Sequence, residues 1–198
     1  MKIVPTVIPG CFQIIPDIRG DERGSFVKVF HEDVFREHGL ATDYAEEYYS
    51  VSHRDVIRGL HFQTPPHAHA KLVYCTQGAV MDAALDLRRG SPTYGQHITL
   101  ELSAANGHML YLPAGLAHGF CSLSEQSLMV YKVTTTYAPN NDAGLLWNSA
   151  GIDWPVREPI MSARDRQFGS LADFESPFVF DEAANAAAKM TAPAGAKP

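Results

Sequence analysis

The sequence lacks an excess of basic residues. Its 198 residues contain 16 Lys and Arg against 22 Asp and Glu, which gives a formal net charge of -6. A nucleic-acid-binding domain normally presents a strongly basic face, so this composition argues against DNA or RNA as a partner. It leaves a small anionic ligand open, because a few local Arg and Lys side chains can bind one whatever the net charge.

Long apolar runs and paired cysteines are also missing. No stretch approaches the roughly 20 apolar residues that a membrane-spanning helix needs, which predicts no membrane partner. The first ten residues carry Pro5 and Pro9 where an export signal would need an uninterrupted apolar segment. The cysteines, Cys11, Cys75 and Cys121, are widely spaced and form no CxxC motif. This pattern predicts reduced thiols in a cytoplasmic protein, without a disulfide framework or a zinc site.

Short β-branched and aromatic runs, separated by Gly, Pro and Asn, follow one another between about residues 26 and 137. Such spacing predicts an all-β sandwich or barrel. A short helix is expected at residues 32–38, with Gly39 ending it. Residues 138–180 are rich in Pro, Asn, Asp and Trp and are expected to wrap the barrel as loops. We expect one domain over residues 1–182 and a disordered, low-complexity tail over 183–198.

Two segments resemble the motifs of cupin barrels. Residues 107–118 place Gly, Pro, Gly and His at the spacings of the second cupin motif, and residues 61–78 resemble the first. The first motif normally carries a metal-binding Glu seven residues before its Gly, and here the residue seven before Gly78 is Lys71. A lysine ammonium has no lone pair for a cation. The resemblance therefore implies a cupin-type antiparallel β-barrel (jelly roll) with a few short helices and no catalytic metal.

Three histidines keep a metal site open as an alternative. His67, His69 and His118 could in principle form a triad. His67 and His69, however, follow Pro65 and Pro66, and the run offers no carboxylate close by. The favoured interpretation of the HAH pair is two exposed loop histidines.

The segment RGLHFQ leads to a more specific resemblance. The chain resembles the dTDP-4-dehydrorhamnose 3,5-epimerases and their relatives, through segments that cover most of residues 17–165 in the same order: DERGSF, RGLHFQ, AKLV, LDLRRGSPTYG, LPAGLAHGF, YKVTTTYAP, LLWN, GIDWP and PIMSARD. The resemblance implies an epimerase that inverts C3, C5 or both in a nucleotide-linked 4-keto-6-deoxy sugar, without a cofactor. The resemblance further implies a role in deoxysugar biosynthesis for a cell-surface polysaccharide or a glycosylated metabolite.

The chemistry of this reaction needs three kinds of group. A ketone at C4 acidifies the hydrogens on C3 and C5, so inversion requires a base on one face, an acid on the other and a cation at the enolate oxygen. The resemblance assigns the base to His61, whose tautomer Asp165 would hold. It assigns the acid to Tyr131 and the cation to Lys71.

The resemblance also implies a substrate-binding set and a homodimer. Arg23, Arg58, His118 and Arg164 are assigned to the diphosphate, Tyr137 to stacking on the base, and Lys28, Gln63 and Asp142 to further substrate contacts. The dimer is expected to exchange N-terminal strands, which covers unpaired strand edges and brings Arg23 to the partner's nucleotide site.

Strand parity tests these assignments in part. If residues 131–137 form one continuous strand, Tyr131 and Tyr137 share a face. His61 and Arg58 have opposite parity although the resemblance places both in the site. A bulge at Gly59 would re-aim one of the two side chains.

Two departures from the family pattern leave the nucleotide open. Lys28 stands where the dTDP enzymes have Glu, and residues 46–52, EEYYSVS, replace a Gln-Asp-Asn run that contacts thymine. A carboxylate at Glu46 or Glu47 could accept NH groups of guanine or cytosine, so GDP or CDP is an alternative to dTDP. Three other functions also stay open: a nucleotide-sugar 3,4-ketoisomerase, a metal-dependent cupin oxygenase, which Lys71 disfavours, and a non-catalytic sugar-nucleotide binder.

Overall fold

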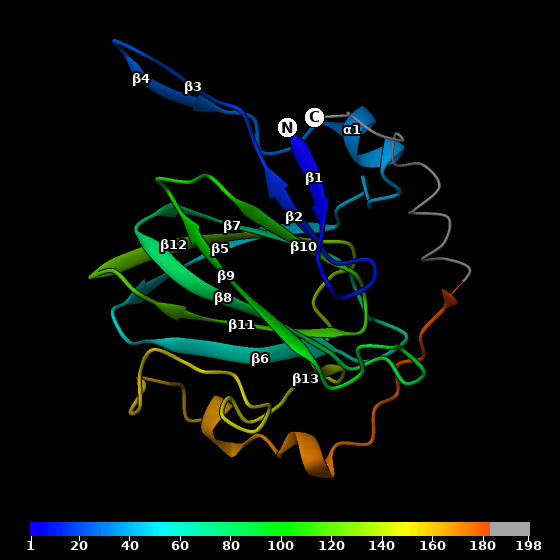
Figure 1. Ribbon diagram of the computed structural model, residues 1–198. Helices are drawn as coiled ribbons and strands as arrows, with labels where there is room; N and C mark the ends of the chain where they lie inside the picture. Colours follow the sequence, from blue (N-terminus) through cyan, green and yellow to red (C-terminus); the bar gives the residue numbers. More distant parts are fainter. Residues whose placement is uncertain (183–198) are drawn as a thin grey trace.

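The computed structural model describes residues 1–182, so the tail expected over 183–198 lies outside the described residues (Figure 1). The strands are β1 (Lys2–Pro5), β2 (Phe12–Ile15), β3 (Ile18–Asp21), β4 (Gly24–Val27), β5 (Glu46–His53), β6 (Ile57–Gln63), β7 (Lys71–Gln77), β8 (Ala79–Asp86), β9 (His97–Ser103), β10 (Met109–Leu112), β11 (Leu116–Ser122), β12 (Gln126–Val133) and β13 (Asp142–Gly144). The helical segments are α1 (Glu32–Glu37) and the 3-10 turns η1 (Asp165–Gln167) and η2 (Leu171–Asp173).

Two antiparallel sheets face each other and form the barrel. One has the strand order β1-β2-β10-β7-β12-β5, and the other has the order β13-β6-β11-β8-β9. Strands β3 and β4 form a separate hairpin that projects away from the barrel (Figure 1). This architecture confirms the predicted all-β class.

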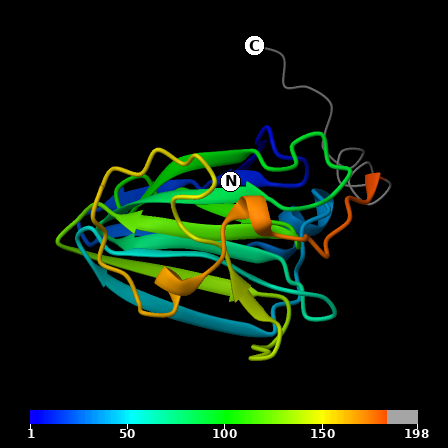
Figure 2. The ribbon, with the colours of Figure 1, turned by 90° about the horizontal axis from the view of Figure 1, so that it is seen from below.

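Alternating residues of both sheets build the core between them. The inward-facing apolar cluster includes Val73 of β7, Leu110 of β10, Phe120 of β11 and Met129 of β12. The outer face of the five-stranded sheet is covered by loops after β13, seen below β6 in Figure 1 and running over it in Figure 2. The outer face of the six-stranded sheet packs against α1 through the fully buried Phe35. Alternate side chains of the strands therefore pack either in the core between the sheets or under the segments that cover the outer faces.

The expected local features are mostly present. Helix α1 ends at Glu37, one residue short of the predicted range, and residues 138–180 are mainly loops that also contribute β13. The bulge at Gly59 is confirmed: His61 pairs with His118 while Arg58 pairs with Phe120, so β6 has one residue more than β11 over this interval. Gly59 has φ +131°, and a Cβ there would lie 2.5 Å from the Cα of Gly119. Only glycine permits this close approach of two backbones.

The prediction of one continuous strand over residues 131–137 was wrong. Strand β12 ends at Val133, and the amide of Thr134 still donates to the carbonyl of Ala70 before the chain leaves the sheet. Tyr131 and Tyr137 nevertheless line the same cavity. The path of the loop, and not strand parity, brings Tyr137 there.

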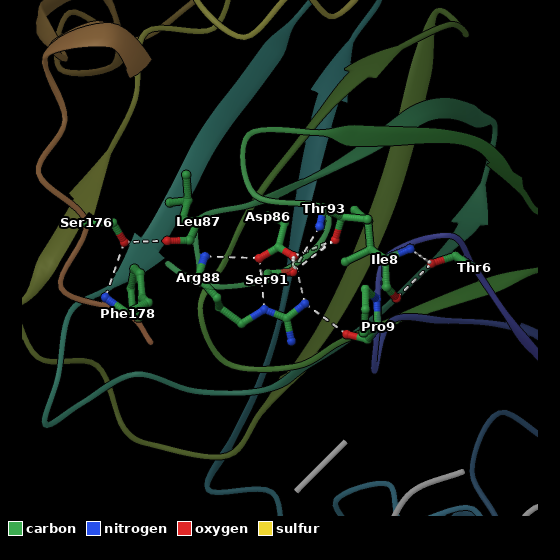
Figure 3. Close-up of polar contacts among 10 residues, drawn as sticks. All are labelled: Thr6, Ile8, Pro9, Asp86, Leu87, Arg88, Ser91, Thr93, Ser176 and Phe178. Carbon is green, nitrogen blue, oxygen red and sulfur yellow. Dashed lines mark hydrogen bonds and ion pairs between the residues drawn. The ribbon is translucent and has the colours of Figure 1, made fainter. Parts of the chain in front are cut away.

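The end of β8 and the segment after it contain a buried ion pair and contact residues near both ends of the described chain. Asp86 accepts hydrogen bonds from Arg88, Ser91 and Thr93, and Arg88 also donates to the carbonyl of Pro9 (Figure 3). Burial alone would favour the neutral acid, but these donors hold the pKa of Asp86 below its usual value. The hydroxyl of Ser176 donates to the neighbouring Leu87 carbonyl. The LDLRRGSPTYG segment therefore holds the fold together away from the cavity.

Candidate active site

A cavity of about 390 Å³ opens between the two sheets. Its lining comes from β5, β6, β7, β11, β12, β13 and the loops that follow them: Glu46, Tyr48, Ser50, Arg58, His61, Phe62, Gln63, His69, Lys71, His118, Phe120, Tyr131, Val133, Thr135, Tyr137, Asp142 and Arg164. The structure thus brings together most of the residues that the sequence assigns to substrate, and it adds several that the sequence did not suggest.

His61 lies on the wall formed by the five-stranded sheet. Its Nε2 is 2.9 Å from Oδ1 of Asp165, which η1 carries up to β6, as predicted. Burial of Asp165 favours its neutral form, but hydrogen bonds from His61, Ser162 and the Gly59 amide lower its pKa. An ionised Asp165 holds the ring proton on Nε2, which leaves Nδ1 of His61 as a free base.

Tyr131 lies on the facing wall, in β12 of the six-stranded sheet. Its hydroxyl is 3.0 Å from Oγ of Ser50, and its ring stacks on Tyr48 with centroids 5.0 Å apart. Burial raises the pKa of Tyr131, so the phenol keeps its proton at neutral pH. An intact phenol on one wall and a free imidazole nitrogen on the other form an acid and a base on opposite sides of the cavity.

Lys71 reaches between these two groups. It begins β7 on the six-stranded sheet, and its Nζ donates to the backbone carbonyl of His61, 3.2 Å away on the other sheet. The side chain is 7% exposed, and burial lowers the pKa of Lys71 to about 8, although Asp142 and Asp82 attract the ammonium. A partly desolvated cation at this point can stabilise an oxyanion strongly.

His118 is a buried residue of the cavity lining. It is 4% exposed, and its Nε2 is 2.7 Å from Oδ2 of Asp82, a fully buried carboxylate of β8. Sequence reasoning missed Asp82. The alternation of β8 could have suggested it, because an Asp that alternates with the apolar Val80 and Ala84 requires a buried partner.

The rim of the cavity carries the more exposed charged groups. Arg58 is held by Oγ of Ser52 and the Val51 carbonyl, while Arg164 pairs with Asp142 at 2.7 Å. Both arginines lie where an anionic group could enter from solvent. Tyr137 is 61% exposed at the same rim, a placement that suits stacking on a base.

Gln63 supports the loops around the cavity. Its amide nitrogen donates to the His67 carbonyl and to Nδ1 of His69, and its oxygen accepts from the Ala138 amide at 2.7 Å. The expectation of exposed loop histidines was wrong, because both are half-buried and His69 lines the cavity. Burial lowers the pKa of His69 to about 3, so this ring is neutral.

Glu46 and Glu47 point in opposite directions along β5. Glu46 lines the cavity, and its carboxylate accepts from the Tyr137 amide at 3.0 Å. Glu47 pairs with Lys132 at 3.0 Å and does not line the cavity. The alternation of β5 therefore leaves one carboxylate near the rim.

Two assigned residues do not reach the cavity of their own chain. Arg23 lies on the β3–β4 hairpin with its side chain 90% exposed and pairs with Asp21. Lys28 lines a separate hollow at the base of the hairpin, together with Arg19 and His31. The β3–β4 hairpin, which carries Arg23, projects away from the barrel (Figure 1).

The proposed histidine triad does not form. Within residues 1–182, no group of three His, Cys, Asp or Glu side chains is placed to hold a metal ion. Nε2 of His118 is engaged with Asp82, and the Lys71 ammonium lines the same cavity. Also within this range, no helix is long and apolar enough to cross a membrane.

Comparisons with known proteins identify the family. Residues 5–173 match the family model described as dTDP-4-dehydrorhamnose 3,5-epimerase. The chain belongs to this family. It is 41% identical over 168 residues to the dTDP-4-dehydrorhamnose 3,5-epimerase of Shigella flexneri, which covers 83% of this chain and 93% of the relative. It is 39% identical over 176 residues to a dTDP-4-dehydrorhamnose 3-epimerase of Streptomyces niveus, covering 87% and 85%.

A solved structure extends the agreement to the fold. The dTDP-6-deoxy-D-glucose-3,5-epimerase of Legionella pneumophila, in complex with dTDP-4-keto-L-rhamnose, superposes with a TM-score of 0.86 at 33% identity, covering 91% of this chain and 98% of that chain. The cupin-type barrel is thereby confirmed. The chain is an isomerase of the carbohydrate epimerase class.

Proposed function

We propose that this epimerase inverts C3 and C5 of a dTDP-linked 4-keto-6-deoxy sugar through an enolate, without a metal. The observation that carries the proposal is the placement of His61 and Tyr131 on opposite walls, with Lys71 between them. An acid and a base on opposite faces of a planar enolate invert a stereocentre, whereas a single group on one face restores it.

The steps follow from the contacts. His61 removes the proton beside the ketone through Nδ1, and Asp165 stabilises the resulting imidazolium. Lys71 holds the oxygen that becomes negative. Tyr131 delivers its proton to the other face of the carbon, with Ser50 hydrogen-bonded to the phenol as it does so. Arg58 and Arg164 hold the diphosphate at the rim.

Incubation with the substrate in deuterated water, followed by NMR, tests the reaction. We expect deuterium at both C3 and C5 of the product. Deuterium at C3 alone would correct the proposal to a 3-epimerase, the activity in the name of the Streptomyces niveus relative. Movement of the carbonyl from C4 to C3 would replace it with a ketoisomerase. The His61→Asn variant should incorporate no deuterium and serves as the control.

Two observations support dTDP over GDP or CDP. The relatives described above are named for dTDP sugars. In addition, Glu47 pairs with Lys132 and does not line the cavity, and Oε1 of Glu46 already accepts from the Tyr137 amide, so only part of one carboxylate remains for guanine or cytosine. Calorimetric titration with the three diphosphates should show tightest binding of dTDP. Tighter binding of GDP or CDP would refute this assignment.

We also propose a homodimer in the cytoplasm. Strand β1 pairs with β2, and β2 pairs with β10, all within the same chain, so the element available for exchange is the β3–β4 hairpin. The exposed Phe26 and Arg23 on this hairpin suit insertion beside a second copy. The buried free thiols support a reducing compartment. Light scattering should give twice the chain mass, and an Arg23→Ala variant should bind dTDP more weakly. A fully active monomer would contradict the dimer.

A further inference from the structure

Two histidine–carboxylate pairs lie side by side in the cavity. His61 and His118 occupy paired positions on the neighbouring strands β6 and β11. Each ring has Nε2 on a carboxylate, at 2.9 Å for Asp165 and 2.7 Å for Asp82. In both rings this leaves Nδ1 as the nitrogen that can meet a substrate. The proposed mechanism uses the first pair as the base and gives the second no protonation state.

The two carboxylates have different surroundings. Asp165 accepts from His61 and from the amide of Gly59, and its histidine side chain is 31% exposed to solvent. Asp82 is fully buried, and its second oxygen, Oδ1, has no hydrogen-bond partner among residues 1–182. Burial raises the pKa of Asp82, whereas the donors around Asp165 lower the pKa of that group.

The number of protons on the Asp82–His118 pair decides whether Nδ1 of His118 donates or accepts a hydrogen bond. If the Asp82–His118 pair holds one proton, the proton lies between them, the pair is an anion, and Nδ1 is an acceptor. If it holds two protons, the pair is neutral overall and Nδ1 carries hydrogen, whichever partner holds the shared proton. A buried net charge without full hydrogen bonding costs several kcal/mol, which favours the neutral pair.

The groups that face the pair do not reverse this preference. Lys71 faces it from β7, but Asp142 is the carboxylate that stabilises the Lys71 ammonium most. Tyr131 approaches from β12 with its ring 6.0 Å from that of His118, and burial keeps its phenol neutral. The buried thiols of Cys11 and Cys75 also have raised pKa values and carry no charge.

We propose that Asp82 keeps His118 loaded with a proton on Nδ1, so that His118 is a hydrogen-bond donor to the C4 oxygen of the sugar, beside Lys71. The inference rests on the proposed function. His118 is 4% exposed at the floor of the cavity, next to the base in strand register. The arginines that suit a diphosphate lie at the rim instead. Asp82 does not line the cavity and acts through His118, as a positioning residue.

The protonation state can be measured on the wild-type protein without substrate. Histidine labelled with ¹⁵N, observed by NMR between about pH 6.5 and pH 8.5, reports whether each ring nitrogen carries hydrogen. We expect Nδ1 of His118 to be protonated over the whole range and Nδ1 of His61 to be unprotonated at its upper end. The signals are assigned by their loss in His118→Gln and His61→Asn. An unprotonated Nδ1 in His118 would overturn the proposal, even if the enzyme were an epimerase.

The same substitution in the two pairs gives a matched test. An Asn amide donates to Nε2 and places the ring hydrogen on Nδ1. At Asp165 this destroys the base, so Asp165→Asn should lower kcat on the order of 10²–10⁴-fold. At Asp82 it preserves the Nδ1 donor, so Asp82→Asn should lower kcat by no more than about 10-fold. Asp82→Leu, which removes the partner, should lower kcat on the order of 10²-fold with a smaller change in KM.

Circular dichroism and thermal unfolding verify that each variant is folded. Equal losses in Asp82→Asn and Asp165→Asn, in folded proteins, would overturn the proposal. So would a folded Asp82→Leu variant with wild-type kcat. If the wild-type protein lacked epimerase activity, the proposed function would fail while the NMR measurement still decided the proton count.

Discussion

Replacing Lys71 with Met should make the protein more stable and at the same time inactive. The ammonium is 7% exposed, and its pKa is lowered by burial from 10.5 to about 8, which corresponds to about 3 kcal/mol of destabilisation. Methionine is of similar length and needs no solvation. It leaves the His61 carbonyl without the Lys71 donor, which costs about 1 kcal/mol. The net gain at neutral pH should therefore be about 2 kcal/mol.

The gain should depend on pH in a defined direction. The folded pKa lies below the unfolded one, so between about 8 and 10.5 the unfolded chain binds more protons at this position. Wild-type stability therefore rises with pH in this window, relative to a chain without the lysine. Urea unfolding should show a smaller stability advantage of Lys71→Met over the wild type near pH 10 than at pH 7. A variant no more stable than wild type at pH 7, or an advantage equal at both pH values, would refute the reasoning.

Activity should change in the opposite sense. Without the ammonium at the C4 oxygen, kcat should fall on the order of 10²–10³-fold. The wild-type enzyme should lose activity as pH rises through about 8, because Lys71 loses its charge there. Lys2→Met, an exposed lysine of the edge strand β1, is the matched control and should change stability by less than about 0.5 kcal/mol.

Three further outcomes are expected. Tyr131→Phe should still exchange deuterium with retention of configuration, while inversion slows on the order of 10²–10⁴-fold. If NMR showed epimer formation at the wild-type rate, the acid would be another residue, with Tyr137 the first candidate. Asp86→Asn should destabilise the fold by about 3–5 kcal/mol in urea unfolding, because it leaves Arg88 buried without its counter-ion; a change under about 1 kcal/mol would contradict that role. Exhaustive chelation should leave activity intact, and loss of activity that a stoichiometric transition metal restores would overturn the metal-free mechanism.

Strand patterning and motif spacing allowed much of the site to be predicted. Lys71 was located by its spacing of seven residues before Gly78, which is the position of the Glu in the cupin motif that this segment resembles. The bulge at Gly59 was predictable because His61 and Arg58 could not otherwise share the cavity. Both inferences combined a resemblance with the period-two geometry of a strand, which can be counted along the sequence.

Other features depend on contacts between distant segments. Glu46 and Glu47 are equivalent in the sequence, and only the register of β5 against β12 turns one inward and pairs the other with Lys132. The loop beyond Val133 brings Tyr137 to the rim through bonds to Gln63 and Glu46, not through strand parity. Such outcomes are set by tertiary packing.

The sequence by itself determined the class of fold, because alternation and turn residues specify a barrel. The base, the acid and the cation came from the resemblance to the epimerase family and remain part of the proposal. Only the tertiary structure decided which carboxylate meets which imidazole. Asp82 and His118 are 36 residues apart, and Asp165 and His61 are 104 apart. The burial of each pair, and hence its proton count, arises when β8, β11 and η1 pack around the cavity. That burial is a property of all the surrounding segments together, and no local pattern encodes it.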